Sequence, residues 1–169
     1  MSYIFRLAVM SELDSIWTII QSAIQRRSRE GSNQWQDGYP NREVITHDIE
    51  NSIGYVLTVE DEIVGYVAVL INDEPEYARL EGKWITENDF VVFHRVAVAE
   101  KHLGKGFAKQ LFLEIEKFSL SKNIFSIKAD TNHDNNQMLY LFEKLGYKHC
   151  GRVYFRGSPR EAYEKVLIK

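Results

Sequence analysis

The stretch Val96-Ala97-Val98-Ala99-Glu100-Lys101-His102-Leu103-Gly104-Lys105-Gly106-Phe107-Ala108 decides how the rest of the chain is interpreted. It continues the apolar run that begins at Phe90, which predicts a central strand covered on both faces. After it, apolar residues follow helical spacing at Phe107, Leu111, Ile115 and Phe118. The first amides of a helix lack intrahelical partners and carry the positive end of its dipole, and glycines let several amides face one anion. This strand, loop and helix therefore predict a phosphate-binding site.

Apolar periodicity and turn residues predict the elements on either side of this loop. They are a strand at 4–7, a helix at 11–27, a loop at 30–40, a helix capped by Asn41 and stopped by Gly54, strands at 55–60 and 63–71, a polar connection at 72–89, a strand at 90–98, a helix at 106–123, a strand at 125–130, a helix at 135–145, and strands at 147–154 and 161–168. We therefore expect an α/β fold with a mixed, largely antiparallel sheet of seven strands. Helices flank that sheet, and its centre is one right-handed β-α-β unit.

Length and composition exclude several classes of protein. The 169 residues fit a single domain, 1–169, and the lone Cys150 cannot form an internal disulfide. A net charge of −3 gives no general attraction to nucleic acid. No apolar run approaches the ~18 residues of a membrane span, and the opening residues lack a signal-peptide core. We expect a soluble cytoplasmic protein with no nucleic-acid or membrane partner.

Besides the phosphate site of a larger cofactor, the residues alone offer three interpretations of the glycine loop, and one of them is excluded. Gly104-Lys105-Gly106 supplies the first two glycines of a dinucleotide fingerprint, with Asp130 further on, but Lys109 stands at the third glycine position. A nucleoside-triphosphate loop is excluded because the chain has no G-x-x-x-x-G-K-[ST]. The simplest alternative is a plain strand-to-helix turn.

Two motifs together resemble the GCN5-related N-acetyltransferase (GNAT) superfamily. The stretch Lys101-His102-Leu103-Gly104-Lys105-Gly106 is similar to that family's Gln/Arg-x-x-Gly-x-Gly/Ala loop, which follows its fourth strand. Asn135, Met138-Leu139 and the run 141–147 (LFEKLGY) are similar to its Asn-x-x-Ala-x-x-Leu-Tyr-Glu-Lys-Leu-Gly-Phe element. The predicted order of elements agrees with the family over nearly the whole chain.

The resemblance implies an N-acetyltransferase that uses acetyl-CoA as cosubstrate and acetylates a primary amine directly. The pantetheine arm would pair with the backbone of one strand segment, the amides of the loop would hold the pyrophosphate, and one asparagine would lie against the arm. A slot for the thioester would open between the fourth and fifth strands. The residues that the resemblance assigns to CoA are Val96, Ala97, Val98, Lys101, His102, Leu103, Gly104, Lys105, Gly106, Phe107, Ala108 and Asn135.

The chain departs from the family pattern at two positions. Lys101 replaces the usual Gln or Arg, so it keeps a donor and loses the planar fork. Phe142 stands where many members carry a tyrosine that protonates the leaving thiolate, and phenylalanine cannot donate a proton. A non-catalytic CoA-binding or sensing module of the same fold is therefore the alternative function.

Aminolysis of a thioester needs a base for the amine. His94 is the candidate, because imidazole titrates in the useful range and strand alternation places it with Val92, Val96 and Val98. Its competing interpretation is a buried histidine satisfied by its neighbours. For the acid, Tyr154 is the candidate, with packing or a water molecule as alternatives.

Acceptor recognition is expected from aromatic rings and a carboxylate, which suit a cationic amine. The candidates are Trp35, Tyr39, Tyr77, Trp84 and Asp130. The spacing of His133, Asp134 and His94 matches no metal-ligand motif, so no metal is expected. The sequence identifies neither the acceptor nor the oligomeric state, although dimers are common among similar proteins and a homodimer is one expectation.

Overall fold

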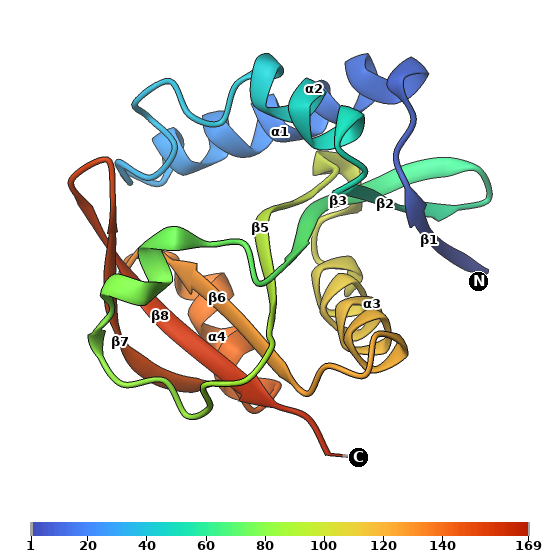
Figure 1. The fold of residues 1–169 in the computed structure, drawn as a ribbon. Helices are drawn as coiled ribbons and strands as arrows, with labels where there is room; N and C mark the ends of the chain where they lie inside the picture. The colour runs from blue at the N-terminus through green and yellow to red at the C-terminus, as the bar shows by residue number, and fades with distance from the viewer. Residues whose placement is uncertain (1, 169) are drawn as a thin grey trace. The chain divides into compact units, whose positions relative to one another are not determined.

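The sheet of this protein has eight strands in the order β1-β2-β3-β5-β6-β8-β7-β4. The computed structural model describes residues 2–168, and Figure 1 labels its elements from the blue N-terminus to the red C-terminus. The strands are β1 (Tyr3–Leu7), β2 (Gly54–Val59), β3 (Glu62–Ile71), β4 (Glu81–Gly82), β5 (Val91–Val98), β6 (Ser126–Thr131), β7 (Lys148–Phe155) and β8 (Ser158–Val166). The α-helices are α1 (Leu13–Arg29), α2 (Arg42–Glu50), α3 (Phe107–Ser121) and α4 (Asn136–Lys144), and short 3₁₀ turns cover Met10–Glu12, Pro75–Arg79 and Glu100–His102.

The α/β class, the order of elements and the mixed sheet are confirmed, and the number of strands is corrected from seven to eight. The pair β5–β6 is parallel, as the crossover through α3 requires, and the other strand pairs with a described register are antiparallel. The additional strand, β4, lies in the segment 72–89 that was expected to be an irregular connection. It has only two residues, both exposed, which is too short for an alternating pattern to show.

The described chain divides into two compact units, residues 2–69 with 95–114 and residues 70–94 with 115–168. The unit boundaries fall inside β3, β5 and α3, so each of these elements contributes residues to both units. A single domain stays a prediction. Within residues 2–168, no helix combines the length and the apolar character that a membrane crossing requires.

The first unit is built on the antiparallel strands β1, β2 and β3. Glu60 and Asp61, both with positive φ, form the two-residue turn between β2 and β3, as a tight hairpin requires. Asn41 caps α2, because its Oδ1 accepts a hydrogen bond of 2.9 Å from the amide of Val44. The core of this unit is Ala8, Ile16, Ile19, Ile20, Ala23, Ile45, Ile49, Val56, Tyr66, Ala97 and Ala99.

The second unit contains the β6–β8–β7–β4 part of the sheet, in which β7 and β8 run side by side in the red part of Figure 1. The register of β5 against β6 covers only Val91 with Ile127 and Val92 with Lys128. A cluster of buried residues in this unit comprises Tyr77, Val92, Val153 and Ala162, and Leu70, Leu80, Trp84, Phe90 and Phe155 pack against it.

Candidate active site

His94 lies at the centre of a polar cluster in the second unit. Its Nε2 is 2.7 Å from Oε2 of Glu74, and its Nδ1 is 4.0 Å from Oδ2 of Asp130. All three side chains are largely buried, with exposed fractions of 17% for His94, 11% for Glu74 and 9% for Asp130. The imidazole is thus held between two carboxylates and still reaches solvent.

The register of β5 against β6 explains why His94 and Asp130 meet. Val92 pairs with Lys128, so the next positions on the same face are His94 and Asp130, two residues further along each strand. This is where the described pairing of β5 with β6 has ended, while Asp130 still pairs with Ala162 of β8. Pairing with β8 therefore fixes the backbone of Asp130, and its side chain approaches that of His94 on β5.

Tyr77 holds Asp130 in place. Its hydroxyl donates a 2.6 Å hydrogen bond to Oδ2 of Asp130, and its carbonyl accepts a 2.9 Å bond from the indole N–H of Trp84. The ring of Tyr77 also lies 5.1 Å from that of Trp84 and 6.3 Å from that of His94, measured between centroids. Of the predicted acceptor-binding residues, Tyr77, Trp84 and Asp130 therefore belong to one cluster with His94.

Glu74 is a site residue that sequence reasoning missed. It precedes Pro75 and caps the 3₁₀ turn Pro75–Arg79, because its Oε1 accepts a 3.2 Å bond from the amide of Glu76. One carboxylate oxygen thus orders the turn while the other binds His94. An acidic residue directly before a proline that opens a helical turn was the available signal.

Burial shifts the acid–base properties of the cluster. It raises the pKa of Asp130 against the opposing effects of His94, the Tyr77 hydroxyl and Arg160. Burial, followed by the charge of Asp130, raises the pKa of Tyr77 well above its ordinary value, so this phenol stays a neutral donor. Ionised Asp130 therefore costs folding stability, which is typical of a residue retained for function.

We expect Asp130→Asn to raise the Tm at pH 7, because it removes a carboxylate whose ionised form is disfavoured by burial. The folded carboxyl has a raised pKa, so the folded state binds more protons than the unfolded chain, and its stability falls as pH rises through that pKa. Asparagine removes the charge and keeps an acceptor for Tyr77. The gain in Tm should shrink as the pH is lowered to about 3, below the unfolded pKa of about 3.9, where wild-type Asp130 is protonated in both states. Thermal unfolding from pH 3 to 8 measures this, with Asp61→Asn at the exposed hairpin turn as the control. A gain that is the same at every pH would contradict it.

The predicted phosphate loop lies in the first unit. After β5 ends at Val98, the chain passes through the turn Glu100–His102 and through Gly104 and Gly106, whose φ angles are +75° and +85°. The amide of Gln110 donates to the carbonyl of Gly106, so the amides of the first three residues of α3 precede the first α-helical donor. A Cβ at either glycine would meet no atom within 4 Å, so the main chain is open to a bulky anion. These features fit the pyrophosphate of a CoA molecule.

Side chains at the start of this loop contact Glu62 of β3. Lys101 forms an ion pair with Glu62, and Nε2 of His102 is 3.3 Å from the same Oε1. These two contacts lower the pKa of Glu62. The ring of His102 also packs edge-on against that of Phe107, at 5.6 Å. The positive side chains near the loop are thus partly neutralised by Glu62, and the main-chain amides carry the attraction for an anion.

The strand segment assigned to the pantetheine arm is firmly held. Ala97 is buried in the core of the first unit, and the amide of Ala99 donates a 2.8 Å bond to the carbonyl of Val64 on β3. Arg95, directly before this segment, has a left-handed φ of +60°. The predicted alternation along β5 cannot be extended through such a residue. Val92 and His94 share the neighbourhood of Tyr77, but their face cannot be extended to Val96 and Val98 by counting residues.

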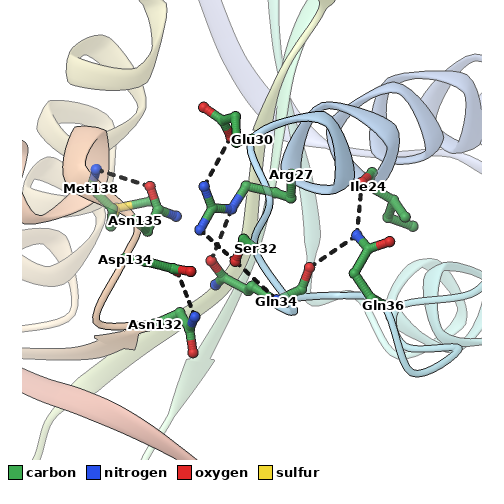
Figure 2. A network of polar contacts seen from close by, with 10 residues as sticks. All are labelled: Ile24, Arg27, Glu30, Ser32, Gln34, Gln36, Asn132, Asp134, Asn135 and Met138. Atoms are coloured by element: carbon green, nitrogen blue, oxygen red, sulfur yellow. Dashed lines mark hydrogen bonds and ion pairs between the residues drawn. The ribbon is translucent and has the colours of Figure 1, made fainter.

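Asn135 caps α4, with its Oδ1 accepting a 3.3 Å bond from the amide of Met138 (Figure 2). Nearby, Nδ2 of the Asn132 side chain donates a 2.6 Å bond to Oδ1 of Asp134. Asn135 thus has a local structural role as a helix cap, and its contact with CoA stays a prediction.

The loop at 30–40 is ordered by polar contacts of the first unit. Arg27 pairs with Glu30 and donates to Ser32 and Gln34, and Figure 2 shows how these side chains fasten the end of α1 to the loop. Within this loop, Trp35 packs against the core of the unit, and the hydroxyl of Tyr39 contacts the guanidinium of Arg95. The described contacts of these two predicted acceptor residues are therefore structural.

Tyr154 does not join the His94 cluster in the second unit. It is 42% exposed on β7, and its phenol interacts with Glu81 and Arg152, of which Glu81 raises its pKa. Phe155, the next residue, packs edge-on against the His94 ring at 6.2 Å. Alternation along β7 turns Tyr154 away from this neighbour, so its role as the acid has no support from its position.

Phe142, the residue that replaces the family tyrosine, is fully buried. Its ring stacks on that of Tyr163 at 4.6 Å and lies 5.1 Å from that of Tyr147. The side chain of Phe142 therefore packs in the core of this chain.

Within residues 2–168, no group of three or more His, Cys, Asp or Glu has a geometry that could hold a metal ion.

Comparisons with known proteins agree with this arrangement. A family model described as "Acetyltransferase (GNAT) family" matches residues 17–147. The crystal structure of a GNAT-family acetyltransferase from Streptococcus agalactiae 2603 has a TM-score of 0.89 and 34% sequence identity, over 99% of this chain and 96% of that one.

Two curated relatives match part of the chain. N-acetyltransferase 8B of Homo sapiens is 27% identical over 101 residues, which are 60% of this chain and 40% of that protein. Streptothricin acetyltransferase of Escherichia coli is 26% identical over 111 residues, 66% of this chain and 56% of that protein. The chain thus matches about half of each of these two curated relatives. Because the family model covers more than half of its residues, this chain belongs to the GNAT acetyltransferase family.

Proposed function

We propose that this protein transfers an acetyl group from acetyl-CoA directly to a primary amine of a small molecule, a peptide or a protein. The observation that carries the proposal is the placement of His94 between Glu74 and Asp130. Family membership supports the use of acetyl-CoA, and the open amides at the start of α3 fit its pyrophosphate. One curated relative is named an N-acetyltransferase, which supports nitrogen as the acceptor atom.

The acceptor must reach the site as an amine that can lose a proton, because an alkylammonium with a pKa near 10 is not a nucleophile. His94 is arranged to take that proton. A carboxylate can only accept hydrogen bonds, so Nε2 of His94 carries the hydrogen that is donated to Glu74. In the neutral imidazole, Nδ1 is then the free acceptor. Glu74 fixes the tautomer and stabilises the imidazolium that forms.

Asp130 supplies the binding site for the ammonium. Its Oδ2 and Nδ1 of His94 are 4.0 Å apart, so one donor nitrogen can lie about 2.9 Å from both atoms. The acceptor would bind to Asp130 as a cation and release one proton to His94. Tyr77 keeps Asp130 in place, and the surrounding rings of Trp84 and Phe155 favour a cationic amine with an apolar chain.

Acetyl-CoA, when bound, would supply the thioester whose carbonyl carbon bonds to the amine nitrogen as the carbon–sulfur bond breaks. The second proton of that nitrogen would leave with the thiolate as the free thiol, directly or through water. A departing thiolate is a modest base, with a pKa about 8.5 by analogy with cysteine, so it needs no strong general acid. This agrees with a buried phenylalanine at position 142 and with the outward position of Tyr154. The side chains of the cluster would therefore act mainly on the proton transfer from the amine to His94.

A screen of primary amines and peptides for thiol release from acetyl-CoA tests the proposal. We expect at least one acceptor to stimulate thiol release and to gain an acetyl group by mass spectrometry, whereas the matching alcohol does not. Cationic amines that carry an apolar chain should be the best acceptors. The alternative, a CoA-sensing module, predicts that CoA binds by calorimetry and that no amine in a broad library is acetylated.

A further inference from the structure

Arg95 combines two features that a residue within a strand rarely has. Its φ of +60° is left-handed, which is unfavourable for any residue with a side chain. Its guanidinium is also nearly buried, with 9% of the side chain exposed. Backbone strain of this kind persists only when the surroundings hold it, and it is concentrated at functional sites.

The contacts that hold Arg95 all come from the first unit. Its Nε and Nη2 donate bonds of 2.8 and 2.7 Å to the two oxygens of Asp48 on α2, and its Nη1 contacts the hydroxyl of Tyr39. Asp48, only 1% exposed, also accepts a 2.6 Å bond from the hydroxyl of Tyr66 on β3. Burial by itself lowers the pKa of Arg95, but Tyr39 and Asp48 outweigh burial and raise it, so the cation is permanent.

We infer that Arg95 is a positioning residue, whose pairing with Asp48 enforces a left-handed kink that sets the start of the strand segment Val96–Val98. This segment is the one whose backbone is assigned to the pantetheine arm, so the inference rests on the proposed use of acetyl-CoA. Its far end is fixed by the bond from Ala99 to Val64, and the Arg95–Asp48 pair fixes its near end to α2. Kinks within strands serve to end pairing and to redirect side chains next to active sites.

A mere structural role and a positioning role make different predictions for glycine and alanine. Either substitution removes the ion pair with Asp48, but glycine adopts a φ of +60° readily and alanine does not. If Arg95 only neutralises Asp48, the rest of the fold keeps the kink in both folded variants, so alanine lowers Tm through strain but both variants bind CoA equally. If Arg95 enforces the kink, the alanine variant loses the kink and binds CoA more weakly, and the glycine variant keeps part of the kink and of the affinity.

The comparison is best made as Arg95→Gly against Arg95→Ala, both combined with Asp48→Asn. The asparagine removes the buried charge that either single variant would leave unpaired, so both proteins should fold, and it keeps an acceptor for Tyr66. Hydrogen exchange of the Ala99 amide without CoA reports the strand segment, and calorimetry reports the affinity for CoA. We expect the alanine variant to exchange this amide about fivefold faster and to bind CoA about fivefold more weakly than the glycine variant.

Equal exchange and equal affinity in two folded variants would overturn the inference. The exchange measurement needs no catalysis, so a wild-type protein that acetylates no amine would remove the proposed function and leave this test valid. A difference in exchange without any difference in CoA affinity would also overturn it, because the kink would then have no bearing on the cosubstrate.

Discussion

His94→Ala is expected to lower kcat for acetyl transfer about a thousandfold, within the range of 10²–10⁴ that is typical of general-base catalysis. We propose that Nδ1 of His94 takes the amine proton, and no other described side chain of the cluster offers a neutral base. The affinity for CoA should stay within about twofold, because the amides assigned to its pyrophosphate belong to residues 102–108. Steady-state kinetics and calorimetry measure the two quantities separately.

The control for this variant is His149→Ala. His149 is on β7, its side chain is 51% exposed, and its described ion partner is Glu161 at 3.6 Å. Its loss should change neither kcat nor CoA affinity. A His94→Ala protein that folds and retains wild-type kcat would exclude His94 as the base and leave deprotonation to solvent.

Glu74→Gln separates the base from the group that orients it. Glutamine keeps the size of the side chain but removes the charge that fixes the tautomer of His94 and stabilises the imidazolium. We expect a loss of about ten- to a hundredfold in kcat, smaller than that of His94→Ala. The two losses should not add in the double variant, because Glu74 acts through His94.

The fold was predictable because its signals are local. Each signal depends only on residues close together in the sequence: Asn41 as a helix cap, the turn at Asp61 and the helical spacing from Phe107. His94 could be proposed as the base for the same reason, since it interrupts an apolar strand, and that role stays a prediction. The strand β4 was missed because two exposed residues, Glu81 and Gly82, carry no periodicity.

Contacts between distant segments account for what could not be predicted. The meeting of His94 with Asp130 depends on the register of β5 against β6, and apolar patterning identifies strands without setting their register. Glu74 reaches His94 from a segment that looked like a polar connection. The left-handed conformation of Arg95 could not be predicted from an uninterrupted β pattern. We infer that it depends on the ion pair with Asp48, which lies on a helix distant in the sequence. The contacts of the candidate site thus depend on packing between distant segments, whereas the predicted cosubstrate loop is recognised from local sequence.

Gly104→Val is expected to weaken CoA binding at least tenfold, about 1.4 kcal/mol or more. The φ of +75° at Gly104 is unfavourable for a β-branched residue, and the new side chain would stand in the open space where the pyrophosphate should approach the amides. Gly157→Val is a matched control, because Gly157 has a φ of +77° and its Cβ would also meet no atom within 4 Å. It lies in the turn between β7 and β8 and so carries the same backbone strain at a place with no predicted contact to CoA. Both variants should lose similar amounts of Tm, and only Gly104→Val should lose CoA affinity in a calorimetric titration. Equal affinities in the two folded variants would mean that CoA does not approach the main chain at this loop, and the assignment of the amides at 102–108 would have to be abandoned.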